Sequence, residues 1–283
     1  MRLLDSERNG RLRDVVVFLS ASVPNREGFK KVPDAPFLIE QAVVSLARGV
    51  FSEGGQIVFG AHPSISPLVA SVASEYRLAG SPDEIKPVVI YQSEAFTEVL
   101  PKDTSDMFRF GFAELIWTEA RGGEKYILKE PASRSCPQSL RHMRERMIRE
   151  TKPRIMVVVG GMEGVFEEVD LFSDFWMHNT ELLRDKPKPP PLLYVATSTG
   201  GAAARVPEET RFEVLKELLT DPASELPFLH EIEQDWERET ALTEPREAIA
   251  SDAIGDPREV PLPALGAMMQ WLVGRIAELS VPQ

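Results

Sequence analysis

The residues best suited to chemistry lie between Ser139 and Glu168, where arginines, glycines and glutamates follow at short spacing. An arginine-rich stretch precedes an apolar run at 155–159, and a turn then carries Gly160, Gly161, Gly164, Glu167 and Glu168. A strand that ends in glycines at a helix start offers backbone N–H groups to an anion, because the first helical turn leaves them without partners. This order predicts a binding turn for a nucleotide or sugar phosphate.

Three further apolar runs end in small polar residues. They end in SASVPN, GAHPSIS and TSTGG, and the candidate ligand contacts on them are Ser20, Ser22, Gly60, His62, Ser64, Thr197 and Ser198. Turns favour glycine and serine for geometric reasons, so a single strand end of this kind is weak evidence for a ligand site. In an open parallel sheet, however, the carboxyl ends of the strands meet at one edge, where ligands bind. We therefore expect these residues and the glycine turn to converge.

Several of these residues also have structural interpretations. His62, beside Pro63, is more typical of a turn or a helix start than of a catalyst, and Ser64 could cap a helix. Glu167 and Glu168 could complement the dipole of their helix. Adjacent helical positions point about 100° apart, so we expect at most one of the two glutamates to face a ligand.

The arginines before the glycine turn differ in their expected environment. A helical arrangement from Leu140 places Arg144 inside an apolar arc, and Arg146 on its flank; the arc consists of Leu140, Met143, Met147 and Ile148. A cation within an apolar stripe indicates an ion pair or a ligand. Arg141 and Arg149 are expected to be solvated.

Strand-like and helix-like segments alternate along most of the chain. We predict strands at 15–19, 56–59, 87–91, 114–117, 155–159 and 192–196, and helices at 37–51, 65–76, 134–150, 163–177 and 207–219. Short apolar strands without polar alternation are typical of parallel sheets covered on both faces. The pattern predicts an α/β, Rossmann-like, doubly wound and mainly parallel sheet of six to seven strands.

The last part of the chain has a different composition. Residues 220–260 contain twelve Asp or Glu and three Arg, which is most of the net charge of −12. Within them, an acidic amphipathic helix would carry Phe228, Ile232 and Trp236, and a final helix at 265–279 would turn Met268, Met269, Leu272 and Ile276 inward. We therefore predict a nucleotide-binding Rossmannoid domain at 1–219, with 220–283 as an acidic linker and helical extension of the same domain.

Composition restricts the class of protein. Hydrophobic residues make up 43%, as in globular proteins, and no apolar run reaches the roughly 20 residues that cross a bilayer. The start of the chain does not have the apolar stretch of a signal peptide, and Cys136 is the only cysteine, so we expect a cytoplasmic protein. The acidic balance argues against nucleic acid as a partner. No metal, cofactor or membrane association is expected.

The block MRERMIRETKPRIMVVVGGMEGVFEE resembles the motif of the SLOG superfamily, whose LOG branch comprises cytokinin riboside monophosphate phosphoribohydrolases. The matching positions are Met143, Arg146, Gly160, Gly161, Gly164 and Glu168. The strand ends VFLSASVP and VFGAHPSISPLV are more similar to SLOG domains associated with sirtuin and TIR proteins in antiphage defence, which bind NAD-derived signals. The resemblance implies a Rossmann-like fold and a nucleotide pocket, usually in a homo-oligomer.

The chain also departs from the LOG motif. Arg144 and Met147 replace its histidine and lysine, Val159 its proline and Val165 its threonine, and one extra residue precedes Gly164. Three of these changes, at the histidine, lysine and threonine positions, alter polar groups around a phosphate site and argue against hydrolysis. Binding through backbone N–H groups depends less on side chains.

Three hypotheses follow. The leading one is a sensor in signalling or antiphage defence that binds a nucleotide or an NAD-derived ligand similar to ADP-ribose or cyclic ADP-ribose. Arg144 or Arg146 would neutralise the charge of the phosphates, and Glu168 would accept hydrogen bonds from ribose hydroxyls. The alternative is an N-glycosidase that releases the base from nucleoside monophosphates, with Arg146 holding phosphate and Glu168 assisting catalysis. The third is a structural subunit that docks a partner through the acidic 220–260 segment.

Overall fold

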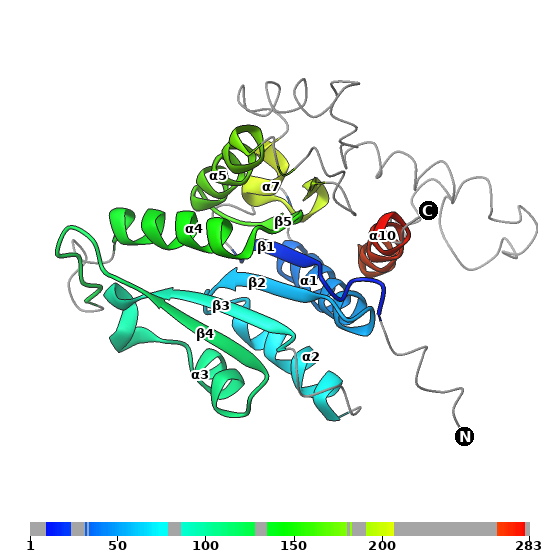
Figure 1. The fold of residues 1–283 in the computed structure, drawn as a ribbon, viewed down its shortest axis with the longest axis horizontal. Helices are drawn as coiled ribbons and strands as arrows, with labels where there is room; N and C mark the ends of the chain where they lie inside the picture. Colours follow the sequence, from blue (N-terminus) through cyan, green and yellow to red (C-terminus); the bar gives the residue numbers. More distant parts are fainter. Residues whose placement is uncertain are drawn as a thin grey trace, which may run out of the picture.

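Six parallel strands form the sheet, and helices cover both of its faces (Figure 1). The structure is a computed structural model that describes residues 10–23, 32, 34–78, 86–127, 135–179, 182, 191–206 and 265–280. The strands are β1 (Val16–Ser22), β2 (Gln56–Gly60), β3 (Val88–Ser93), β4 (Ala113–Thr118), β5 (Ile155–Gly160) and β6 (Leu192–Ala196). The α-helices are α1 (Ala35–Ser52), α2 (Ser66–Leu78), α3 (Lys102–Arg109), α4 (Pro137–Thr151), α5 (Gly164–His178), α7 (Gly201–Arg205) and α10 (Leu265–Ser280).

The order of the strands shows where the winding of the sheet reverses. The order is β4-β3-β2-β1-β5-β6, and every neighbouring pair is parallel. The chain moves outward from β1 to β4, and β5 then joins the other side of β1. The register pairs Ser20 with Val158 and Ser22 with Gly160, so β1 and β5 end level. The prediction of a doubly wound parallel sheet is confirmed, with six strands.

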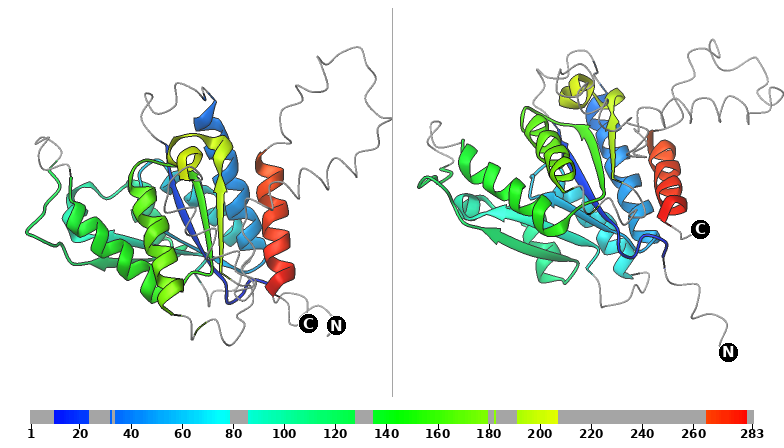
Figure 2. Two further views of the ribbon diagram at one scale, coloured as in Figure 1. Left: turned by 90° about the horizontal axis from the view of Figure 1, so that it is seen from above. Right: turned by 45° about the horizontal axis from the view of Figure 1, so that its top comes forward.

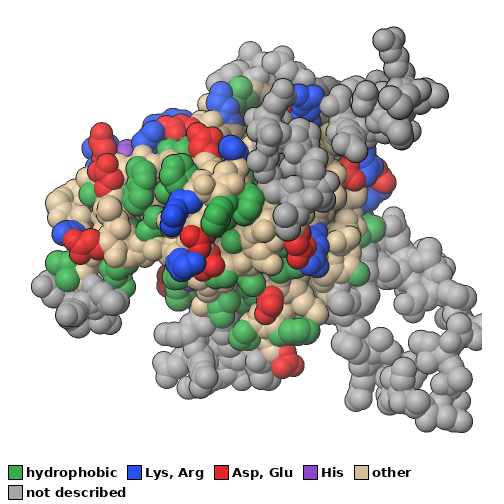
Figure 3. Space-filling view, turned by 90° about the horizontal axis from the view of Figure 1, so that it is seen from below, with side chains coloured by type: hydrophobic (Ala, Val, Ile, Leu, Met, Phe, Trp, Pro, Cys, Tyr) green, Lys and Arg blue, Asp and Glu red, His purple; other side chains and the backbone are tan. Residues whose placement is uncertain are grey.

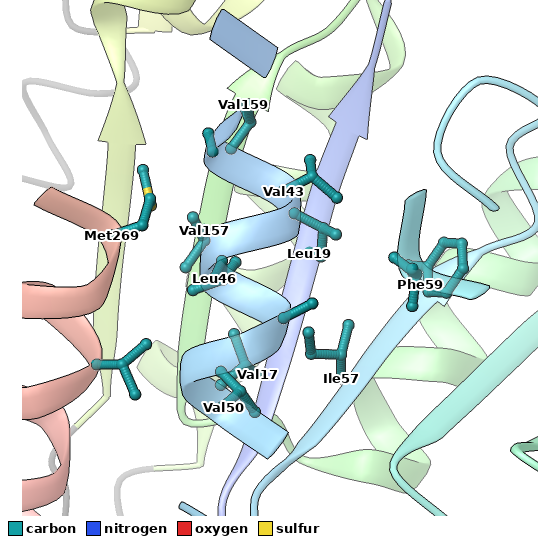
Figure 4. Close-up of a cluster of buried hydrophobic side chains, with 14 of the residues drawn as sticks. Val17, Leu19, Val43, Leu46, Val50, Ile57, Phe59, Val157, Val159 and Met269 are labelled. Carbon is teal, nitrogen blue, oxygen red and sulfur yellow. The ribbon is translucent and has the colours of Figure 1, made fainter. Parts of the chain in front are cut away.

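The two faces of the sheet contain two hydrophobic cores. On β5, Val157 and Val159 pack with α1 and α10, whereas Met156 and Val158 pack with α4 and α5. The first core is shown in Figure 4, where side chains of α1 lie over β1, β2 and β5. A strand that is buried on both faces contains an unbroken apolar run, because side chains on both sides avoid water. This explains the sequence of β5.

Prolines and a backbone turn determine where α4 begins and ends. The helix begins at Pro137, three residues later than predicted, and a proline is tolerated there because the N–H group it lacks would have no helical partner. The helix ends at Thr151, and the next residue, Lys152, caps it with a left-handed backbone of φ 47° and ψ 54°. Pro153 follows and cannot continue the helix. The chain then enters β5 directly.

Short elements account for most of the differences from the sequence prediction. The helix α3, the 3-10 helices η2 (Glu94–Val99) and η4 (Thr197–Thr199), and α7 were not predicted. In α3 only Thr104 and Met107 are buried, so its sequence has almost no apolar periodicity. The helix predicted at 207–219 and the acidic helix around residues 228–236 lie outside the described residues.

The C-terminal helix α10 completes the core on the α1 face. It lies beside α1 in all three ribbon views (Figures 1 and 2). Leu272 and Ile276 are fully buried, which confirms the inward face predicted for them. The two helices approach closely at Gly49, where a β-carbon would lie 3.0 Å from Val273. In the described part of the chain, no helix is both long enough and apolar enough to cross a membrane.

Candidate functional site

The candidate site lies where β1 and β5 end side by side. These two strands are the ones from which successive crossovers lead to opposite sides of the sheet. Chain connections diverge at such a point and leave a crevice beyond the carboxyl ends of the strands, which is where open α/β sheets bind ligands. The end of β1 contributes Ser20 and Ser22, and the end of β5 contributes the glycine turn that opens α5. The fold thus brings the two motifs to one place.

The first two glycines of the turn serve the packing of the protein itself. Gly160 and Gly161 have positive φ angles of 62° and 91°, which are unfavourable for residues with a β-carbon. The N–H of Gly160 donates to Oγ1 of Thr199 at 2.7 Å, and the N–H of Gly161 donates to the carbonyl of Ser22 at 2.8 Å. A β-carbon on Gly160 would lie 2.5 Å from Ile39. Both N–H groups therefore have internal acceptors, in contrast to the expectation that a ligand would use them.

The start of α5 offers backbone donors instead. Within the part of the chain that the structure describes, the N–H groups of Met162, Glu163 and Gly164 have no hydrogen-bond acceptor. Met162 is 46% exposed, so the turn reaches the surface. A β-carbon on Gly164 would lie 2.5 Å from Nη2 of Arg144, which places this guanidinium directly on the helix N-terminus. Of these three donors Gly164 was among the predicted residues, whereas Met162 and Glu163 were not.

Arg144 is the centre of an ion-pair cluster. Its Nε donates to Glu168 at 2.9 Å, and its Nη1 donates to Glu167 at 2.5 Å. The hydroxyl of Ser20 donates to the other oxygen of Glu168, which links β1 to α5. The side chains of Arg144 and Glu168 are only 14% and 16% exposed. Of the two alternatives expected for an arginine in the apolar arc of α4, an ion pair or a ligand, the structure shows the ion pair.

The electrostatics of the cluster follow from its partial burial. Burial acts to lower the pKa of Arg144, but the charges and hydrogen bonds of Glu168 and Glu167 outweigh this effect and raise the pKa. A cation on the N-terminus of a helix opposes the helix dipole, and the two carboxylates in the first turns of α5 compensate for it. Arg144 Nη2 has no hydrogen-bond acceptor among the described residues. This N–H group can therefore bind an anion without breaking either ion pair.

A second group of polar residues lies at the end of β2. The Oγ of Ser64 lies 2.8 Å from Nδ1 of His62 and accepts the N–H of Val23 at 3.0 Å. Nδ1 of His62 also accepts the N–H of Ser64, so a neutral imidazole carries its proton on Nε2. Burial lowers the pKa of His62, which favours this neutral form. His62 thus lies in the turn before α2, where its carbonyl accepts the N–H groups of Ile65 and Ser66, and its Nε2–H has no acceptor among the described residues.

Arg146 makes its contacts elsewhere. Its Nε donates to Glu150 at 2.6 Å and its Nη1 donates to the carbonyl of Trp117 at 3.1 Å. Glu150 in turn accepts the hydroxyl of Tyr91. The enzymatic alternative assigns phosphate binding to Arg146 and catalysis to Glu168, but the arginine that contacts Glu168 is Arg144. Arg141, expected to be solvated, is 58% exposed and contacts Glu167 at 3.4 Å.

The loop after β6 joins the glycine turn through a residue that the sequence analysis did not select. Thr199 is fully buried; its Oγ1 accepts the N–H of Gly160 and donates to the carbonyl of Ala196 at 2.5 Å. The N–H of Ala202 donates to the carbonyl of Gly161 at 3.0 Å. Thr197 and Ser198, the residues that were predicted, are half-buried in η4. Only the pairing of β5 with β6 reveals the role of Thr199, because its partner is 39 residues away in sequence.

Replacing Thr199 with valine is expected to lower the free energy of unfolding by about 1–3 kcal/mol, because the variant leaves the buried N–H of Gly160 without an acceptor. Urea unfolding followed by tryptophan fluorescence measures the change. Thr197→Val is the matched control and is expected to stay within about 0.5 kcal/mol of the wild type. Equal unfolding midpoints for Thr199→Val and the wild type would show that this hydrogen bond does not hold the two turns together.

Apart from Arg146, Thr197 and Ser198, the predicted residues fall into three groups in the structure. Ser20, Arg144, Glu167, Glu168 and Gly164 form one cluster. The buried turn of Gly160 and Gly161 lies beside it, held by Ser22 and Thr199. Gly60, His62 and Ser64 form the end of β2, which is tied to β1 through Val23. The cluster around Arg144 and the turn after β2 contain the donors and acceptors that a ligand could use.

Comparison with known proteins gives one match. The chain matches the family model described as the SLOG cluster3 family over residues 30–228. No curated protein and no solved structure matches it. The matched region includes Arg144, the glycine turn and both glutamates. It begins after β1 and ends before α10.

Proposed function

Because this chain belongs to the SLOG cluster3 family, we propose that it binds a nucleotide or an NAD-derived ligand where β1 and β5 end. The family match confirms the resemblance to the SLOG superfamily, and membership is consistent with a nucleotide-related function. The observation that carries the proposal is the cluster of Ser20, Arg144, Glu167 and Glu168 at the point where the winding of the sheet reverses. A sensor role in signalling or antiphage defence is part of this proposal.

The groups of the site suit the parts of such a ligand. Nη2 of Arg144, the N–H groups at the start of α5 and Nε2–H of His62 are donors for phosphate oxygens. The carboxylates of Glu167 and Glu168 accept hydrogen bonds from ribose hydroxyls. Met162 is exposed at the tip of the turn and can pack on a base. A ligand with phosphates, a ribose and a base uses all of these groups, whereas inorganic phosphate uses only the donors.

Isothermal titration calorimetry on the full chain tests the proposal. The ligands are AMP, ADP-ribose, cyclic ADP-ribose isomers and inorganic phosphate. We expect at least one of the nucleotides to bind more tightly than phosphate, and Glu168→Gln to weaken that binding by about tenfold or more, because a charged hydrogen-bond acceptor is lost. Glu75→Gln, on the exposed surface of α2, is the control and should bind like the wild type. Failure of every nucleotide to bind would overturn the proposal.

The same samples distinguish binding from base release. Chromatography of AMP after hours with the protein should recover AMP intact if the chain only binds. Free adenine that disappears in Glu168→Gln would instead identify the N-glycosidase alternative. Arg144, rather than Arg146, would then be the arginine at the reacting centre, because Arg144 contacts Glu168.

A further inference from the structure

Gln92, near the end of β3, has a buried side-chain amide that is hydrogen-bonded at only one of its two ends. The residue is 6% exposed. Its Oε1 accepts the N–H of Ser93 at 3.0 Å, and this contact determines which end of the amide is the oxygen. Among the described residues, Nε2 has no hydrogen-bond acceptor. Most buried polar groups have a partner, and a donor without one is costly, so the free end of this amide requires an explanation.

The two neighbouring strands also end in donors without acceptors. The strands β1, β2 and β3 are adjacent, and their registers place Ser22, His62 and Gln92 nearly level at the carboxyl edge of the sheet. Ser22 is 6% exposed, and no described residue accepts its hydroxyl proton. Nε2–H of His62 is likewise without an acceptor in the described part of the chain. Three successive strands thus offer a row of donors to a ligand.

This row extends away from the cluster of Arg144. Neighbouring strands lie about 4.8 Å apart, so the end of β3 lies roughly 10 Å from the end of β1. A mononucleotide with its base on Met162 and its phosphate at Arg144 does not reach Gln92. A ligand with a second phosphate and a further group does. The amide of Gln92 is uncharged and its oxygen is occupied, so its free end suits an uncharged acceptor, such as a hydroxyl or carbonyl oxygen.

We propose that Nε2 of Gln92 binds the far end of a ligand of dinucleotide length and thereby selects it over mononucleotides. Because the near end of this ligand lies on the cluster of Arg144, the proposal rests on the proposed function. The second phosphate lies across Ser22 and His62. The group at Gln92 is an uncharged oxygen, either a hydroxyl of the terminal ribose in ADP-ribose or the carboxamide oxygen of NAD⁺. Shorter ligands leave the buried donor unpaired and bind more weakly.

Calorimetry of the full chain with three ligands tests the proposal. ADP has both phosphates but no group beyond them, ADP-ribose adds a ribose, and NAD⁺ adds a ribose and a carboxamide. The wild type is expected to bind ADP-ribose about tenfold more tightly than ADP, because a buried donor gains its acceptor. A gain with NAD⁺ alone would assign the contact to the carboxamide. Equal affinities for all three ligands would overturn this proposal but not the proposed function, whereas no binding at all would overturn both.

Gln92→Met isolates the contact from the rest of the site. Methionine has a similar length but no donor, so the variant should bind ADP-ribose only as tightly as it binds ADP. Its affinity for ADP should equal that of the wild type, because ADP does not reach this residue. Gln270→Met changes an exposed amide of α10 and should keep the preference for ADP-ribose. A Gln92→Met variant with that preference would contradict the proposal. The wild-type series decides it even if the loss of the acceptor for Ser93 unfolds the variant.

A second control addresses binding to exposed apolar surface. Figure 3, which views the molecule from the α3 side, shows groups of hydrophobic side chains at the surface. Phe108, at the end of α3, and Phe110, just after it, are 54% and 66% exposed. The double variant Phe108→Ser/Phe110→Ser should bind all three ligands like the wild type. Loss of the preference for ADP-ribose in this variant would place the far end of the ligand on these rings and overturn the assignment to Gln92.

Discussion

Replacing Arg144 with methionine is expected to lower the free energy of unfolding at neutral pH by about 3 kcal/mol, as when one partner is removed from a buried ion pair. Methionine keeps most of the apolar stem but removes the charge. Glu167 and Glu168 then remain near each other in the first turns of α5 without the cation that both contact. The side chains are partly shielded from water, with Arg144 only 14% exposed, so solvent compensates poorly. Denaturant unfolding of the purified variant measures the loss.

Two comparisons show whether the ion pairs cause this loss. Arg149→Met changes an exposed arginine of the same helix and should stay within about 0.5 kcal/mol of the wild type. The double variant Arg144→Met/Glu168→Gln should recover part of the stability, because one of the uncompensated charges is gone. An Arg144→Met variant as stable as the wild type would mean that the cluster contributes nothing to folding and that Arg144 is held there for binding alone.

Replacing Leu272 with alanine is expected to lower the free energy of unfolding by about 3 kcal/mol, within the usual range for leucine in a core. Leu272 is fully buried, with 0% of its surface accessible to water, and it packs in the core that α1 and α10 share with the sheet. The truncation leaves a cavity, because α10 is held close to α1 at Gly49 and cannot move inward. Thermal unfolding followed by circular dichroism measures the effect.

The control for Leu272→Ala lies on the opposite face of the same helix. Gln270 is exposed, and Gln270→Ala should leave the melting temperature nearly unchanged. Equal melting temperatures for Leu272→Ala and the wild type would show that α10 is dispensable for the core. The helix α10 lies beyond residues 30–228, the region that matches the family. The core of this chain thus extends beyond the family region.

Much of the fold could be predicted from local pattern. The apolar run at 155–159 and its neighbours predicted parallel strands buried on both faces, and the structure confirms this for β5 and β6. Helical spacing placed Arg144 in an apolar arc, which was enough to predict an ion pair or a ligand rather than open water. The helix α3 was missed because its sequence is polar with only two buried residues, so no period of hydrophobicity distinguishes it from a loop.

The identities of the interaction partners could not be predicted in this way. Spacing in the helix indicated that Arg144 needs a counter-charge, but contact with both Glu167 and Glu168 depends on how α4 packs against α5. The hydrogen bond from Ser20 to Glu168 joins residues 148 positions apart. The N–H groups of Gly160 and Gly161 turned out to be used inside the protein, because Thr199 and the carbonyl of Ser22 lie within reach.

The amino-acid pattern alone was therefore sufficient for the α/β class, the parallel strands, the polar strand ends and the resemblance to the SLOG superfamily. These properties follow from short-range periodicity and from motifs whose residues are close in sequence. Packing in three dimensions established which arginine meets Glu168, and which backbone N–H groups have no acceptor among the described residues. Each of these depends on contacts between residues far apart in the chain, and such contacts exist only after the strands have paired.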